Sequence, residues 1–431
     1  MKVQKTRSQS KTRPAKEAPR SNWKFRVVPV LIFTIAFLLR LSIIYTGPYG
    51  HTRVLRGHEP QAVAESLVRT SQFANPFHTP TGLTAHLAPF QPLLLATLIA
   101  VFPGDGNYET AKQILSSAAA SLQYALLPLA AVALGLSRAT GITAAALAIL
   151  TFEFLPRNVQ PIETQGTWEA AYAGLALVLL TIAYRRAQPA VFGLACGLTI
   201  LVIPSAALLA AVWLAMRKQK LAVLVAVLTL LPWTARNMLV LGSPIWGRDN
   251  LGLELEVANN DCAASKFTVN RHSGCFEARH PNMNPDEAAK VIEEGEAAYN
   301  SRKLREAVTW MSQNPARFAS LTAERIRLFW FPEIGSSLLT LITLLGFAGA
   351  AVLFKQNREA FWNLAIPLIV YPPVYYLTQN FPRYRYPILW ISFMLAAVAL
   401  GALRSRIWKS NNLSSDNKTK KLSTHSRSKL C

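Results

Sequence analysis

The chain alternates long apolar runs with short polar segments, and the lengths of these runs predict membrane-crossing helices. A helix needs about 20 residues to span the hydrocarbon core of a bilayer. The first run, about 25–45, meets that length, whereas the run 89–102 is too short for a comfortable crossing. Further runs of about this length lie at 111–136, 139–156, 166–184, 220–241, 336–354, 361–378 and 386–404. Continuous apolar runs favour helices over the alternating pattern of a membrane barrel, so we expect an all-α polytopic membrane protein.

One further apolar run, 189–216, is longer than a single crossing requires. It carries Pro204 and Ser205 near its middle. Proline interrupts a helix because it lacks the backbone N–H. The run therefore predicts either one long tilted helix or two short helices that meet at Pro204.

The positions of lysine and arginine orient these elements, because basic residues in short loops mark the cytoplasmic side. Every basic loop falls on that side if 89–102 dips into the membrane without crossing and 189–216 forms two spans. This solution predicts about ten spans, one re-entrant segment and both termini in the cytoplasm. It gathers four polar segments on the outer face, namely 46–110, 157–165, 242–335 and 379–385.

The same layout divides the chain into five parts. These are a basic disordered cytoplasmic tail, 1–24; an N-terminal transmembrane core, 25–241, with its first outer loop at 46–88; an extracytoplasmic insert, 242–335; the C-terminal spans, 336–404; and a second basic disordered tail, 405–431. Within the insert, Asn284 and Asn314 each precede a proline and are expected to cap helices.

Composition supports a membrane protein and shows where its charge lies. Of the 431 residues, 51% are hydrophobic and 16% are charged, against about 25% charged in a typical soluble domain. The net charge of +22 comes largely from the two tails. Basic tails can bind nucleic acid, but beside membrane spans the positive-inside rule explains them, so we expect no nucleic-acid partner.

Two of the four cysteines, Cys262 and Cys275, lie in the insert. An extracytoplasmic location would favour a disulfide between them, and the alternative is two free thiols.

No P-loop, dinucleotide-binding glycine motif, His-Glu-x-x-His motif or nucleophile elbow occurs in the sequence, which disfavours ATP-driven transport and serine hydrolysis. What remains is a set of acids and bases on the predicted outer face.

Glu59, in "RVLRGHEPQAVAESL", begins a short amphipathic helix at the membrane surface. The low dielectric there is expected to raise its pKa into the range of a general base. The alternative interpretation, equally supported by the sequence, is that Glu59 is only a helix-start acid favoured by the helix dipole.

The other candidates each have a functional and a structural reading. Glu169 lies near the outer end of a predicted span, where a carboxylate is a functional candidate or a helix-start acid that reaches the interface. Arg383 and Arg385, in "QNFPRYRYPILW", oppose the positive-inside rule and could bind a lipid phosphate or form a structural salt bridge. Arg157 could pair with Glu169 or bind phosphate. His86, in "TAHLAPFQP", is a lone histidine of the kind that more often packs than reacts.

The order of the motifs resembles that of bacterial membrane glycosyltransferases of the C-type (GT-C) fold, related to protein O-mannosyltransferases and aminoarabinose transferases. The resemblance covers about 25–404 and includes "TGLTAHLAPFQPLLLATLIAVFPG", "PWTARNMLVLGSPIWGRDNLGLELEVANN" and "RYRYPILWISFMLAAVAL". It implies an enzyme that takes a sugar from a polyprenyl-phosphate donor by inverting displacement. The resemblance implies that the sugar is transferred at the outer face of the bacterial cytoplasmic (inner) membrane, among membrane lipids, to an unidentified lipid, glycan or protein acceptor.

The resemblance also implies roles for individual residues. Glu59 matches the essential acid of the first outer loop, and Glu169 matches an acid at the outer end of a later span. Arg383, Arg385 and Arg157 would bind the donor phosphate. The residue before Glu59 is His58, where the family usually has a second acid, so no cofactor is certain and a divalent metal stays open, with His58 as a candidate ligand. The alternatives are a lipid-linked sugar flippase and a non-catalytic membrane scaffold.

Overall fold

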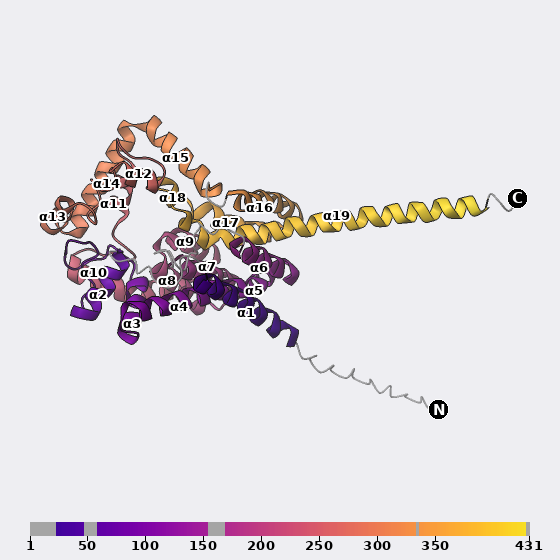
Figure 1. The fold of residues 1–431 in the computed structure, drawn as a ribbon, viewed down its shortest axis with the longest axis horizontal. Helices are drawn as coiled ribbons and strands as arrows, with labels where there is room; N and C mark the ends of the chain where they lie inside the picture. The colour runs from indigo at the N-terminus through magenta and orange to yellow at the C-terminus, as the bar shows by residue number, and fades with distance from the viewer. Residues whose placement is uncertain (1–22, 47–57, 154–168, 333–335, 428–431) are drawn as a thin grey trace, which may run out of the picture.

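A computed structural model describes residues 23–46, 58–153, 169–332 and 336–427. This part of the chain is almost entirely helical, and its only β pairings are two isolated bridges, Ala74–Leu83 and Lys266–Asn380. The helices form a bundle with a smaller helical cap at one end (Figure 1). The described ends of the first and last helices lie at the end of the bundle away from the cap.

Most of the bundle consists of apolar helices. They are α1 (Trp23–Thr46), α4 (Asp105–Ala125), α5 (Leu127–Ala133), α6 (Arg138–Glu153), α7 (Glu169–Arg186), α8 (Pro189–Val202), α9 (Ala207–Arg217), α10 (Lys220–Leu241), α16 (Ser336–Gln356), α17 (Arg358–Val370), α18 (Pro373–Leu377) and α19 (Tyr386–Arg427). Within the described residues, five helical stretches are long and apolar enough to cross a membrane, and five shorter helices are apolar. The expected total of about ten spans stays a prediction.

The long apolar run 189–216 is broken into two helices. Helix α8 ends at Val202, a 3₁₀ turn covers Pro204–Ala206, and α9 begins at Ala207. Pro204 cannot donate a backbone hydrogen bond, so the helix stops there. Of the two alternatives for this run, the structure has the pair of short helices.

Close approach between helices depends on glycine. A Cβ atom on Gly193 of α8 would lie 2.2 Å from the carbonyl oxygen of Ala222 of α10. A Cβ on Gly349 of α16 would collide in the same way with Leu395 of α19. Small residues at such crossings let two membrane helices pack backbone against backbone.

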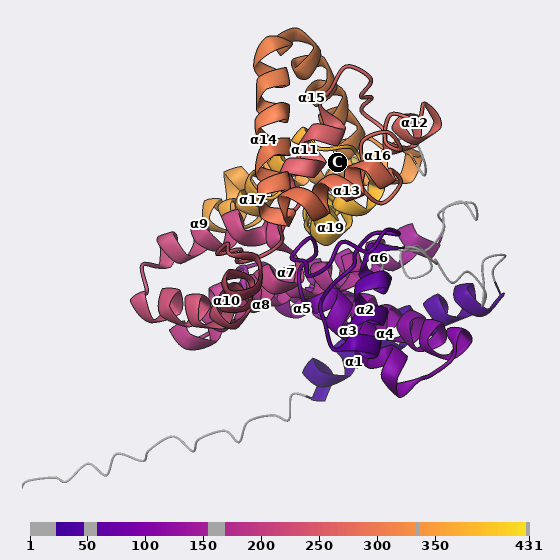
Figure 2. The ribbon, with the colours of Figure 1, turned by 90° about the vertical axis from the view of Figure 1, so that its left-hand side faces the viewer.

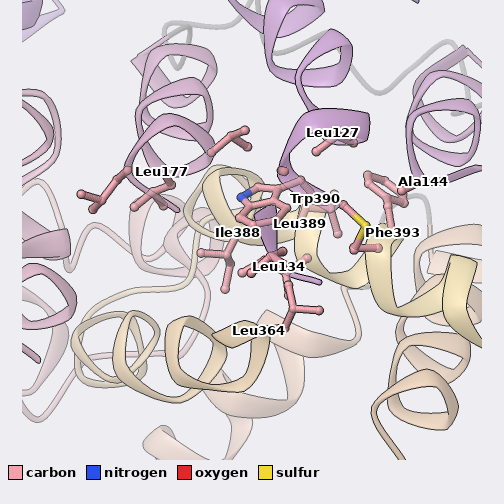
Figure 3. Close-up of a cluster of buried hydrophobic side chains, with 14 of the residues drawn as sticks. Leu127, Leu134, Ala144, Leu177, Leu364, Ile388, Leu389, Trp390 and Phe393 are labelled. Carbon is pink, nitrogen blue, oxygen red and sulfur yellow. The ribbon is translucent and has the colours of Figure 1, made fainter. Parts of the chain in front are cut away.

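The core of the bundle gathers around the first half of α19. Trp390 and Phe393 of α19 are buried against Leu127 of α5, Leu177 of α7 and Leu364 of α17, and Figure 3 shows these side chains packed together. Because elements far apart in the sequence share this core, the N-terminal and C-terminal spans form one body.

Helix α19 continues well beyond its apolar part. It projects from the bundle as a single helix that reaches Arg427 (Figure 1). Residues 405–427 are therefore helical, although their polar composition predicted disorder. A helix already nucleated in the core extends at little further cost, and lysine and arginine are good helix formers. The N-terminal tail, 1–22, lies outside the described residues.

The face of the molecule opposite the projecting end of α19 carries two groups of shorter helices. Helices α2 (Glu59–Thr70) and α3 (Phe90–Val101) form the first group. The cap consists of α11 (Leu251–Ala258), α12 (Phe267–His272), α13 (Pro285–Glu294), α14 (Glu296–Gln313) and α15 (Pro315–Trp330), and Figure 2 shows it on one side of the bundle with α2 and α3 below. With 12 residues, α3 is about 18 Å long, too short to cross a core about 30 Å thick.

The two predicted helix caps in the insert have different outcomes. The side chain of Asn284 accepts hydrogen bonds from the backbone N–H groups of Asp286 and Glu287, as expected. The capping role predicted for Asn314 is wrong, because its side-chain amide instead donates to the carbonyl oxygen of Trp310 in the preceding helix. The Trp310 carbonyl lies in the last turn of α14, so the Asn314 side chain stabilises the helix before it and not the one after it.

A disulfide joins Cys262 and Cys275 within the cap. The loop that this disulfide encloses contains α12, and His280 follows it five residues later. A second link is Arg325 of α15, a fully buried side chain whose guanidinium donates to the carbonyl oxygens of Ala258 and Leu377. The cap is thus held both within itself and to the loop that precedes the last span.

We expect the double variant Cys262→Ser/Cys275→Ser to destabilise the protein by about 3 kcal/mol, the chain-entropy value for a loop of about 15 residues. Thermal unfolding in detergent, monitored by circular dichroism, measures the loss. A reductant should lower the unfolding temperature of the wild type and leave that of the double variant unchanged. An equal effect of the reductant on both proteins would contradict the prediction.

Candidate active site

The site begins at the N-terminus of α2, where Glu59 is the first helical residue. His58 is the N-cap, with an extended backbone, and Pro60 follows in the first turn. Val63 of α2 is fully buried and packs with Phe73 and Leu87 beneath the helix. This anchored apolar face fixes the direction in which α2 presents Glu59.

Two histidines from distant parts of the chain lie against the Glu59 carboxylate. His86 Nε2 is 3.4 Å from Glu59 Oε2, and His280 Nε2 is 3.6 Å from Glu59 Oε1. His86 comes from the loop before α3, and His280 comes from the cap. Both imidazoles are almost fully buried, and the ring of Phe77 packs edge-on against each of them.

The electrostatic environment of Glu59 differs from the one expected for a tuned general base. Burial by itself raises the pKa of Glu59, but His86, by charge and by hydrogen bonding, and then His280 and His58 oppose it, and the pKa ends well below its usual range. The low-dielectric argument predicted a raised pKa and did not include these imidazoles. Glu59 is therefore an ionised carboxylate at neutral pH.

The same three side chains fit the requirements of a divalent cation. Their ligand atoms all lie within 4.8 Å of one another. Two imidazole nitrogens and one carboxylate oxygen are ligands that zinc and related ions accept, with a position left for substrate or water. His58, the candidate ligand from the sequence, is not a member of this group.

One hydrogen bond has to change before His280 can coordinate an ion. The backbone N–H of Asn282 donates to His280 Nδ1 at 3.2 Å, which places the proton of the neutral ring on Nε2. Coordination through Nε2 requires the other tautomer. The bond is long and contributes about 1 kcal/mol at most, far less than the binding of a zinc ion, about 10 kcal/mol or more. The donor set therefore fits a cation.

Several charged groups surround His58, next to Glu59. Burial and then Arg383 lower the pKa of His58, Glu59 and Glu169 act in the opposite direction, and Lys112 acts in the same direction as Arg383. Charges interact appreciably over about 10 Å. Glu169 at the start of α7, Lys112 of α4 and Arg383 before α19 thus lie within electrostatic range of His58, the residue next to Glu59.

Arg383 is the larger of the two cationic influences on the pKa of His58. Its guanidinium lies over the rings of Phe381 and Tyr384, at 4.6 and 5.5 Å from their centroids. Burial lowers the pKa of Arg383, but Tyr384 and the carboxylates of Glu169 and Glu254 outweigh it and the pKa is raised. Arg383 is a fully charged group held on aromatic surface.

Arg385 has a different environment, although only one residue separates it from Arg383. It is buried, and its guanidinium donates to the carbonyl oxygen of Trp330 and to the hydroxyl of Thr343, each at 2.7 Å. Its hydrogen-bonding capacity is used to join the end of α15 and α16 to the start of α19. Arg157, the third predicted phosphate-binding residue, lies outside the described residues.

Sequence reasoning missed three members of this cluster. Lys112 could have been found, because a lysine among the first turns of a long apolar helix is unusual; it is buried and donates to Glu109 at 2.6 Å. Glu254 of α11 was visible only as part of a loose motif. His280 has no local signal at all, since it stands in an irregular polar segment of the cap.

The fold is similar to that of the oligosaccharyltransferase of Archaeoglobus fulgidus. Its apo crystal structure superposes with a TM-score of 0.51, at 14% sequence identity, over 92% of this chain and 53% of that one. The structure tethered through a disulfide to an acceptor peptide containing the NVT sequon gives 0.51 at 13% identity, over 91% and 51%. No protein-family model and no curated protein matches the chain.

The likeness defines the class of fold. This chain spans about half the length of the archaeal enzyme, and at this level of identity the similarity is one of fold. In the part of the chain that the structure describes, the protein is a helical bundle with several apolar helices, and its fold is similar to that of this oligosaccharyltransferase.

We expect the purified protein to bind about one Zn²⁺ ion per chain, as ligand number and spacing at Glu59, His86 and His280 indicate. The double variant His86→Ala/His280→Ala should weaken binding by more than about 100-fold, since even the loss of a supporting partner costs 10- to 100-fold. Metal titration followed by elemental analysis measures both. His272→Ala is the control, because His272 is exposed and bonded only to its own helix. Unchanged stoichiometry in the double variant would rule out this site.

Proposed function

We propose that the chain is a membrane glycosyltransferase that moves a sugar from a polyprenyl-phosphate donor to an acceptor at the outer face of a bacterial cytoplasmic membrane. The observation that carries the proposal is an acid, Glu59, with the Nε2 atoms of His86 and His280 at 3.4 and 3.6 Å from its carboxylate, next to His58, which lies within electrostatic range of Arg383, in a fold similar to that of an oligosaccharyltransferase. An acid and a cation in one space suit the two ends of a displacement: the incoming nucleophile and the departing phosphate.

The reaction is a single inverting displacement at the anomeric carbon. The acceptor's O–H or N–H group donates a hydrogen bond to Glu59, which orients its lone pair toward the sugar. The new bond from the acceptor to the anomeric carbon forms as the bond from that carbon to the phosphate oxygen breaks. The acceptor proton passes to Glu59, and the polyprenyl phosphate leaves with one additional negative charge.

The low pKa of Glu59 makes it a weak base toward a neutral hydroxyl. That does not prevent the transfer, because the proton of the nucleophile becomes strongly acidic as its oxygen or nitrogen bonds to carbon. Glu59 therefore acts mainly by holding the nucleophile and takes the proton late. A divalent cation at Glu59, His86 and His280 would supply Lewis-acid stabilisation of negative charge.

The departing phosphate needs positive charge that is already in place. Arg383 supplies a guanidinium that matches phosphate geometry. Lys112 lies within electrostatic range of His58, but Glu109 already pairs with its charge at 2.6 Å, so Arg383 is the main cation of the proposal. Glu169, which acts on both Arg383 and His58, would hold this basic side of the site in position. Arg385 is left out of the proposal because both terminal nitrogens of its guanidinium already donate to Trp330 and Thr343.

Replacing Glu59 tests the nucleophile end. We expect Glu59→Gln to lower transfer by about 100- to 10,000-fold, the usual contribution of a positioned acid or base. Release of polyprenyl phosphate from labelled polyprenyl-phosphate hexoses and pentoses, in liposomes containing the protein, measures transfer whatever the acceptor. Glu65→Gln is the matched control, since Glu65 lies on the same helix and bonds Gln61. Full activity of Glu59→Gln would reject the assignment, and donor movement across the bilayer without phosphate release would favour a flippase.

Variants of Arg383 and Arg385 should differ in their effects on donor binding and on the stability of the protein. We expect Arg383→Ala to raise the donor KM by about tenfold or more, since a hydrogen bond to a charged group is worth about 1.5–3 kcal/mol, with little change in unfolding temperature. Arg385→Ala should instead lower the unfolding temperature, because it removes two hydrogen bonds of 2.7 Å, to the Trp330 carbonyl oxygen and the Thr343 hydroxyl, from a buried site. Equal effects of the two variants on donor KM would contradict the assignment of the phosphate to Arg383.

A further inference from the structure

The tripeptide Thr84–Ala85–His86 carries one of the two imidazoles at Glu59, yet it belongs to no regular helix or strand. All three residues are buried. An irregular segment can place a side chain accurately only if other parts of the protein bind its backbone. The question is which groups do so here.

Glu296 makes the central contact. It is the first residue of α14 in the cap and is almost fully buried. One carboxylate oxygen accepts the hydroxyl proton of Thr84, and the other accepts the backbone N–H of Ala85 at 2.6 Å. The Thr84 hydroxyl in turn accepts the backbone N–H of His86 at 2.9 Å. Glu296 is thereby connected to the His86 backbone through one hydroxyl group.

Two further groups complete the enclosure of the tripeptide. Arg236 of α10 donates to the carbonyl oxygen of Thr84 at 2.6 Å and to that of Phe73 at 2.9 Å. The backbone N–H of Asp249 donates to the carbonyl oxygen of Ala85 at 2.7 Å. The backbone groups that flank His86 on its N-terminal side are thus bound by α10, the start of the cap and α14 together.

Glu296 occupies this position at an electrostatic cost. Burial raises the pKa of Glu296 to about 7, although His86 and the hydrogen bonds from Thr84 and Ala85 lower it in part. A carboxylate is one of the few side chains that can accept from a hydroxyl and a neighbouring backbone N–H at the same time. The two-acceptor geometry explains why an acid stands where an apolar residue would be easier to bury.

We propose that Glu296 is a positioning residue for the glycosyl transfer: it acts through Thr84 and Ala85 to hold the His86 imidazole against Glu59. The inference rests on the proposed function for its effect on rate. It also gives the cap a task in the reaction, because α14 then sets the geometry of a residue that lies more than 200 positions earlier in the sequence.

Kinetics and hydrogen exchange test the proposal together. We expect Glu296→Ala to lower kcat for polyprenyl phosphate release by about 10- to 100-fold, the cost of a misplaced catalytic group, with the donor KM within about twofold of wild type. Glu296→Gln, which keeps one acceptor and gains a donor toward Thr84, should retain most of the rate. Amide exchange in a peptide covering 82–90 should rise in Glu296→Ala and stay near wild type in Glu296→Gln. Glu306→Ala is the control, because it removes an exposed carboxylate from the same helix.

A double variant separates positioning from general destabilisation. If Glu296 acts through His86, Glu296→Ala should add no further loss of kcat in a His86→Ala background. Thr84→Val provides a second route, since it removes the connecting hydroxyl with little change of shape, and it should reproduce the loss even if Glu296→Ala does not fold. Unchanged exchange at 82–90, or a loss of kcat that multiplies with that of His86→Ala, would overturn the proposal. Absence of polyprenyl phosphate release by the wild type would instead reject the proposed function, and the exchange data would still decide whether Glu296 holds the segment.

Discussion

The site depends on keeping a carboxylate charged where little water reaches it. Glu59 loses hydration at the start of α2, and burial alone would favour its neutral form. The imidazoles of His86 and His280 reverse this preference because they stand within 3.4 and 3.6 Å of its two oxygens. The loop before α3 and the cap together bring these two rings to one carboxylate.

The cap has a structural role on both sides of the site. On the acid side it contributes His280 directly and reaches His86 through Glu296. On the side of the arginines, Arg325 and Asn259 bind the carbonyl oxygen of Leu377, in the segment that leads to Arg383. Through such contacts the cap packs firmly on the helical bundle. This agrees with the small size of the cap and with its small hydrophobic core.

The helices and their boundaries could largely be predicted from local sequence. Apolar runs predicted the positions of the apolar helices, Pro204 marked the break between α8 and α9 as one of two alternatives, and Asn284 predicted a cap whose hydrogen bonds stay within a few residues. Local reasoning failed at Asn314, which bonds the preceding helix, and in 405–427, where helix α19 continues from the core. For Glu59 the sequence supplied the position at the helix start, but not the sign of its pKa change, which depends on residues 27 and 221 positions away.

The sequence by itself determined that the described part of the protein is helical and rich in apolar helices, because hydropathy acts on each segment separately. It also predicted one outer face for the acids and arginines, from the distribution of basic residues among the loops. Only the tertiary structure decided which of these residues meet. It brought His280 to Glu59, placed Arg383 and Lys112 within electrostatic range of His58, and buried Arg385 against Trp330 and Thr343. Interactions between charges fall off within about 10 Å, so their strength and sign depend on packing between distant segments, which no local pattern records.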